Sequence, residues 1–163
     1  MSKPLILVCL CITGLAVPVQ GQETVSNAKR LAPLEWVIGS WQHTWKASDS
    51  KGKVKKGDKM TKVWRFAWTP NQNALLISQI MTTNGKITGQ LDALFGWNRR
   101  EEAIIGTGVG TGGISGSGWT LKIDKSSFAI VVRDSQWDFR RKEKTLVIED
   151  QNGKTRIYTR VGK

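Results

Sequence analysis

The feature that most constrains this chain is an alternation of apolar and polar residues that begins at Val37 and continues almost to the C-terminus. Successive side chains of a β-strand point to opposite faces, so a period of two indicates strands rather than helices. Turn residues separate the alternating runs, and Asn84-Gly85 and Asn152-Gly153 are the strongest hairpin signals. The pattern predicts an all-β fold made of consecutive antiparallel hairpins.

About nine or ten short strands account for this pattern. We expect them at residues 37–46, 59–69, 74–83, 86–97, 102–109, 119–124, 128–135, 145–149 and 155–161, with Trp137 and Phe139 extending the seventh run or beginning a strand of their own. One short helix is predicted upstream, within residues 23–37. There Val25, Ala28 and Leu31 recur at helical spacing, and Pro33 limits the length of the helix.

The order of these elements favours a closed barrel. No segment alternates a strand with a long helix, so a parallel sheet is not expected. Consecutive hairpins form a meander, and a long meander has to hide its two edge strands. Closure into a lipocalin-like barrel removes both edges, and a two-sheet sandwich is the alternative.

The N-terminal segment has the pattern of a secretory signal peptide. Lys3 precedes an apolar run from Leu5 to Val17, and small residues surround the expected cleavage point after Gly21. The run is shorter than the roughly 20 residues that a membrane-spanning helix needs. We therefore expect a signal peptide at residues 1–21, a single β-barrel domain at 22–163, no transmembrane segment after processing, and a secreted or periplasmic protein.

Residue types needed for common catalytic chemistry are scarce. Both cysteines, Cys9 and Cys11, lie in the leader, which leaves the mature chain without a disulfide, a zinc–thiolate site or a cysteine nucleophile. The single histidine is His43, and no serine stands in a strand–turn–helix elbow. The glycine-rich stretch 106–118 has no helix after it, so it is interpreted as a bent strand or wide turn and not as a phosphate loop. We predict a protein that is not an enzyme and holds no metal or cofactor.

The segment from Leu34 to Trp41 resembles the opening of lipocalin-like (calycin) barrels, in which a short apolar lead-in is followed by Gly-x-Trp, here Gly39-Ser40-Trp41. The resemblance implies that Trp41 lies at the closed end of a barrel, with an arginine of a late strand packed on it. Arg160, or its neighbour Arg156, would fill that role. Gly39, Trp41 and Arg160 are therefore expected to be structural.

A larger part of the chain, about residues 34–161, resembles a group of uncharacterised secreted bacterial domains of the planctomycete type. The shared blocks are 64–68, 73–78, 96–98 and 118–120. That group has no established activity, so the resemblance implies a fold and a compartment only. Heme-binding relatives of the barrel class use a histidine near the C-terminal strands, whereas His43 lies near the start, and no heme is expected.

Tryptophan is unusually frequent, with eight residues, all of them after the leader. Aromatic side chains on one face of the 59–69 strand either fill a barrel core or form the wall of an apolar pocket, and both interpretations stay open. For the pocket, the predicted ligand-binding residues are His43, Trp64, Phe66, Trp68, Phe95 and Trp97.

The chain carries 25 lysines and arginines against 13 acidic residues, a net charge of +12. The basic residues are spread along the sequence, and no specific nucleic-acid partner is expected. The sequence favours a barrel that binds a small apolar or amphipathic molecule without catalysis. The alternative is a structural or interaction module that binds an acidic envelope polymer through its basic surface.

Overall fold

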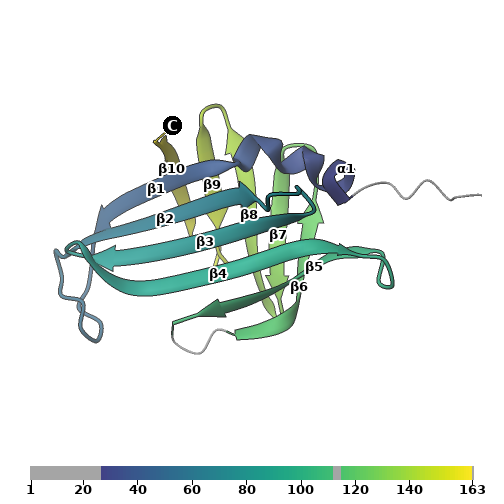
Figure 1. The fold of residues 1–163 in the computed structure, drawn as a ribbon. Helices are drawn as coiled ribbons and strands as arrows, with labels where there is room; N and C mark the ends of the chain where they lie inside the picture. Colours follow the sequence, from purple (N-terminus) through teal and green to yellow (C-terminus); the bar gives the residue numbers. More distant parts are fainter. Residues whose placement is uncertain (1–26, 112–114, 163) are drawn as a thin grey trace, which may run out of the picture.

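A computed structural model describes residues 27–111 and 115–162 of the chain. Ten antiparallel strands close into a barrel in which every strand pairs with its neighbour in sequence and β1 pairs with β10 (Figure 1). The strands are β1 (Gly39–Lys46), β2 (Lys59–Trp68), β3 (Ala74–Thr83), β4 (Lys86–Asn98), β5 (Ala103–Gly110), β6 (Ser115–Ile123), β7 (Ser127–Val132), β8 (Ser135–Lys142), β9 (Thr145–Glu149) and β10 (Thr155–Val161). The predicted all-β barrel is confirmed, and the sandwich alternative is wrong. The predicted signal peptide at 1–21 lies outside the described residues.

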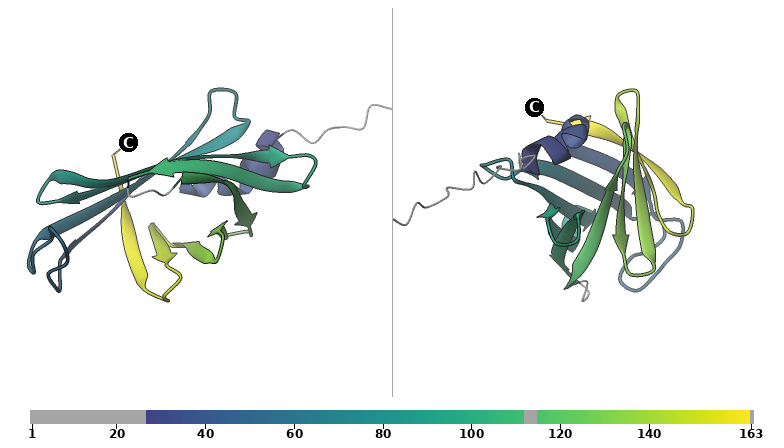
Figure 2. Two further views of the ribbon diagram at one scale, coloured as in Figure 1. Left: turned by 90° about the horizontal axis from the view of Figure 1, so that it is seen from below. Right: turned by 90° about the vertical axis from the view of Figure 1, so that its right-hand side faces the viewer.

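The predicted N-terminal helix is also confirmed. It consists of one α-helical turn, α1 (Asn27–Leu31), followed by a 3₁₀ helix, η1 (Ala32–Val37). Leu31, Leu34 and Val37 are fully buried against the barrel interior. Figure 2 shows this segment lying across one end of the barrel, while the long strands run from it to the opposite end. We call these the closed end and the open end.

The hairpin at Asn84-Gly85 follows the expected turn chemistry. Both residues have positive φ angles, 51° and 81°, as a tight hairpin turn requires. Beyond this turn, a bulge shifts the register so that Met81 faces Gly89 while Thr82 faces Ile87. Strict alternation along the predicted strand at 86–97 puts Ile87 on the same face as Gly89 and Leu91. That expectation is wrong, because the extra residue turns the Ile87 side chain outward, where it is 65% exposed.

The closed half of the barrel is filled by aromatic rings. Phe128 and Phe139 stack with their ring centroids 4.4 Å apart, and Phe66 meets both rings nearly edge-on at 5.9 and 6.0 Å. Offset-stacked and edge-to-face geometries are the preferred arrangements of such pairs. Phe95 is fully buried in the same cluster. This half of the interior is therefore a packed core.

Arg160 packs against the start of β1 at the closed end. Its guanidinium lies over the Trp41 ring, 4.9 Å from the ring centroid, and donates hydrogen bonds to the carbonyl oxygens of Trp36 (3.3 Å) and Ile38 (2.5 Å). The Trp41 indole in turn donates to the carbonyl of Val37 at 2.7 Å. Gly39 adopts φ +125°, where side chains are disfavoured. The three residues expected to be structural thus join η1 to the first and last strands.

Candidate functional site

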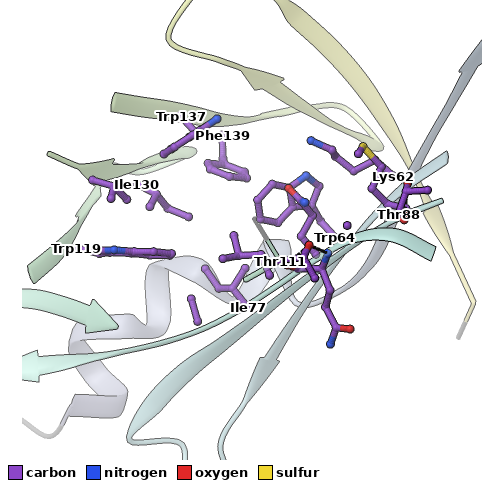
Figure 3. A pocket seen from close by; sticks show the side chains of 16 residues that line it. Lys62, Trp64, Ile77, Thr88, Thr111, Trp119, Ile130, Trp137 and Phe139 are labelled. Atoms are coloured by element: carbon purple, nitrogen blue, oxygen red, sulfur yellow. Dashed lines mark hydrogen bonds between the residues drawn. The ribbon is translucent and has the colours of Figure 1, made fainter. Parts of the chain in front are cut away.

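A cavity of about 330 Å³ occupies the interior towards the open end. Figure 3 shows the rings of Trp64, Trp119, Trp137 and Phe139 around it. Its apolar wall also includes Ile77, Leu91, Ala93, Ile130 and Val132, and its polar residues are Lys62, Gln79, Thr88, Gln90 and Thr111. Ligand pockets in proteins have volumes from about 300 to 1,000 Å³. The cavity lies at the small end of that range.

The floor of the cavity is where the two halves of the interior meet. Trp64 and Phe139 belong both to the lining and to the packed core, and their rings are in edge-to-face contact at 5.4 Å. Phe139 also stacks on Phe128, which holds its ring in place. The bottom of the cavity is therefore built from side chains whose positions the core determines.

Trp119 forms a side wall of the cavity, and two glycines allow it to do so in different ways. A Cβ on Gly108 would lie 2.4 to 3.0 Å from three atoms of the Trp119 ring, so only a glycine fits opposite this ring. Gly118, with φ +81°, is the extra residue of a bulge that pairs Gly106 with Trp119. The glycine-rich stretch was interpreted as a bend. In addition to the bulge, Gly108 provides the space for an aromatic wall.

Of the six predicted ligand-binding residues, Trp64 lines the cavity. Phe66 and Phe95 lie in the packed core, between the cavity and the closed end of the barrel. Trp68 and Trp97 lie towards the closed end. The Trp68 indole donates to the Glu35 carboxylate at 2.8 Å, and the Trp97 ring lies under the Arg30 guanidinium at 3.7 Å.

His43 is held by β10 rather than by the cavity wall. Its Nδ1 lies 2.8 Å from the carbonyl oxygen of Ile157, which can only accept, so Nδ1 carries the proton of this hydrogen bond. The imidazole also stacks on Trp45 at 5.2 Å and meets the Tyr158 ring at 5.3 Å. These contacts fix its orientation within the open half of the barrel.

Sequence reasoning missed Lys62. This residue lies on the inner face of β2, between Met60 and Trp64, and its side chain reaches into the cavity (Figure 3). The signal that could have found it was the alternation itself, because Lys62 falls in phase with the aromatic residues of the strand. A lysine inside a barrel is uncommon unless it is paired or functional.

The charge of Lys62 has no partner among the described residues. No carboxylate there lies within ion-pair distance of it, whereas the nearby Arg156 is paired with Asp150 at 3.1 Å. Burial lowers the pKa of Lys62 from its usual value, Arg156 lowers it further, and Asp150 acts in the opposite direction. Both lowering effects come from the cost of holding a positive charge in this place.

Two further polar groups line the cavity beside Lys62, the Trp64 indole and the Gln79 amide. The buried Trp64 indole nitrogen has no hydrogen-bond acceptor within the described segments. It lies close to the Tyr158 hydroxyl, whose pKa burial raises and the Trp64 indole, as a neighbouring donor, lowers. Gln79 lies directly opposite Trp64 on β3, and its amide makes no hydrogen bond within those segments. Buried polar groups are nearly always satisfied, so the Trp64 indole marks a place for a polar ligand atom, and the half-buried Gln79 amide lies beside it.

The chain thus forms a small closed antiparallel β-barrel with a packed closed half and a lined cavity at the open end, an architecture consistent with a lipocalin-like barrel. No protein-family model matches the chain, and no curated protein matches it either. The resemblance to the planctomycete-type domains therefore stays a prediction. Among residues 27–111 and 115–162, neither helical segment has the length and apolar character that a bilayer crossing requires. Those residues also contain no cluster of three or more metal-ligating side chains.

Proposed function

We infer that this barrel binds a small apolar or amphipathic molecule in its open-end cavity and does so without catalysis. The observation that carries this inference is the cavity itself, about 330 Å³ of space lined mainly by aromatic and aliphatic side chains in a barrel whose other half is packed. Concave, mostly apolar sites with a few convergent polar groups are the usual form of small-molecule sites.

The size and lining of the cavity indicate the affinity to expect. Each methylene moved from water into an apolar site contributes about 0.8 kcal/mol, so eight buried methylenes contribute about 6 kcal/mol. That free energy corresponds to a dissociation constant of tens of micromolar. The rings of Trp64 and Trp119 are already held by their neighbours, so little side-chain ordering opposes binding.

Filling the cavity is expected to abolish binding. Ala93 lines the cavity from β4, and Ala93→Phe would place a ring inside it. We expect 1-decanol to change the tryptophan fluorescence of the unmodified protein in a saturable way. The dissociation constant measured from this change is expected to be at least about tenfold larger in the variant. Ala67→Phe, on the outer face of β2, is the matched control, and circular dichroism checks both folds.

Equal binding of decanol by Ala93→Phe and by the unmodified protein would overturn the proposed site. The lysine-rich loop between β1 and β2 favours a second candidate, binding of an acidic envelope polymer, because its lysines are exposed. Salt-sensitive retention of such a polymer, unchanged by Ala93→Phe, would support that alternative instead.

We also propose that the protein acts outside the cytoplasm, in the periplasm or after secretion. This rests on the signal-peptide pattern of residues 1–21. When the full chain is expressed in a bacterial host, mass spectrometry of the exported fraction is expected to find an N-terminus at or near Gln22. Protein that stays in the cytoplasm with Met1 intact would contradict export.

A further inference from the structure

We propose that the molecule held in the cavity is a single-chain amphiphile with one negative charge, whose anionic head binds Lys62 while its apolar chain lies among the rings. This inference rests on the proposed function and specifies its ligand. It is carried by the meeting of one cation without an ion-pair partner, two neighbouring hydrogen-bond donors and an apolar wall in one cavity.

The position of Lys62 separates a polar part of the cavity from an apolar part. Its Cα pairs with His43 on one side and Met81 on the other, three residues from the start of β2 at the open end. Trp119, Ile130 and Phe139 line the opposite wall. An ammonium group in these surroundings is stabilised far more by an anion than by a neutral group, because water cannot fully screen the pair.

The neighbouring donors suit the same head group. The indole nitrogen of Trp64 can only donate, and it lies one inner-face position from Lys62 on β2. The Gln79 amide lies across from Trp64 on β3 and diagonally from Lys62, within the reach of long side chains. A carboxylate or a sulfate has enough lone pairs to accept from all three groups at once.

The charge balance points to a monoanion. The ionisable groups around Lys62 are His43 on β1, Arg156 and Tyr158 on β10, and Asp150 beside them. Arg156 and Asp150 neutralise each other at 3.1 Å. One uncompensated positive charge is left, and a ligand with a single negative charge cancels it. The desolvation that lowers the pKa of Lys62 is then offset by the bound anion.

The volume points to one short chain. At about 30 Å³ for each methylene-sized group, the cavity holds on the order of ten such groups. A lipid with two long chains does not fit. Exposed lysines surround the same end of the barrel, among them Lys46, Lys51 and Lys59 at the β1–β2 connection (Figure 1). Their positive potential draws anions towards the open end.

The test compares ligands with one chain length and different heads. Decanoate, decyl sulfate, 1-decanol and decyltrimethylammonium are titrated below micelle formation by tryptophan fluorescence, with the unmodified protein, Lys62→Met and Lys122→Met. Lys122 is an exposed lysine on the outer face of β6 and serves as the control. We expect Lys62→Met to weaken binding of both anions by about tenfold or more and to change decanol binding by less than about threefold. Lys122→Met is expected to leave all four unchanged.

The outcomes separate this inference from the proposed function. In one outcome, Ala93→Phe abolishes decanol binding but Lys62→Met does not weaken binding of the anions. This result would overturn the binding of an anionic head by Lys62 and would leave the cavity as the binding site. Failure of every decyl probe to bind would overturn both. Preferential loss of one anion in the variant identifies the head as a carboxylate or a sulfate. If Lys62→Met does not fold by circular dichroism, Lys62→Gln, which keeps a polar end, is held to the same criteria.

Discussion

Replacing Phe139 with alanine is expected to lower the free energy of unfolding by about 4 kcal/mol. The Phe139 side chain is 0% exposed, stacks on Phe128 with ring centroids 4.4 Å apart, and meets Trp64 edge-on at 5.4 Å. Removing the ring deletes its burial and leaves a void that joins the existing cavity. Urea unfolding followed by circular dichroism measures the loss. The slope of the unfolding free energy against urea concentration is compared between variants, because an unchanged slope means that only the stability has changed.

The matched control is Ile157→Ala on β10. Ile157 is 54% exposed, so its truncation is expected to cost less than about 1 kcal/mol. Phe139→Ala should also accept longer alkyl alcohols than the unmodified protein, because its enlarged void extends the floor of the cavity. A loss of stability no larger than that of Ile157→Ala would mean that the ring does not separate core from cavity.

Gly106→Ala is expected to destabilise the barrel by about 3 kcal/mol, although it adds only a methyl group. A Cβ at this position would lie 2.5 Å from Cδ1 of Phe95 and 2.7 Å from the carbonyl oxygen of Leu94. The Phe95 ring is fully buried, and the Leu94 carbonyl belongs to the neighbouring strand β4. Relief of the clash therefore requires a shift of β4 against β5. Thermal and urea unfolding of the purified variant measure the effect.

Gly96→Ala is the control for this substitution. Its Cβ would meet Ala74 Cβ at 3.8 Å and the Asn73 carbonyl oxygen at 3.9 Å, which are ordinary contacts. We expect a change within about 0.5 kcal/mol, because the alanine also reduces the conformational freedom of the unfolded chain. Equal effects at the two glycines would show that Gly106 is not needed for the close approach of Phe95.

The strands could be predicted well because their signals are local. The runs at 74–83, 145–149 and 155–161 match β3, β9 and β10 to the residue, since alternation and turn residues lie within a few positions of each other. The glycine-rich region was harder. The sixth strand was expected to begin at Trp119, yet β6 begins at Ser115, because pairing with β5 continues through glycines that carry no periodic signal.

The candidate site could be predicted only in part. Alternation correctly gave Trp64, Phe66 and Phe95 inward positions, but it cannot say which inward side chains meet neighbours and which meet empty space. Phe66 became core because rings from β7 and β8 reach it, and Phe95 because it packs against Trp119 of β6. The side chains around Lys62 and Gln79 leave space between them instead.

The sequence by itself determined the strands, their antiparallel order and the inward direction of each alternate side chain, because these follow from backbone periodicity and turn chemistry. Only the tertiary structure decided that one half of the interior is filled and the other open, and that Lys62 faces the opening without a partner. Empty volume depends on the summed sizes of side chains from strands far apart in the chain. No local pattern carries that sum.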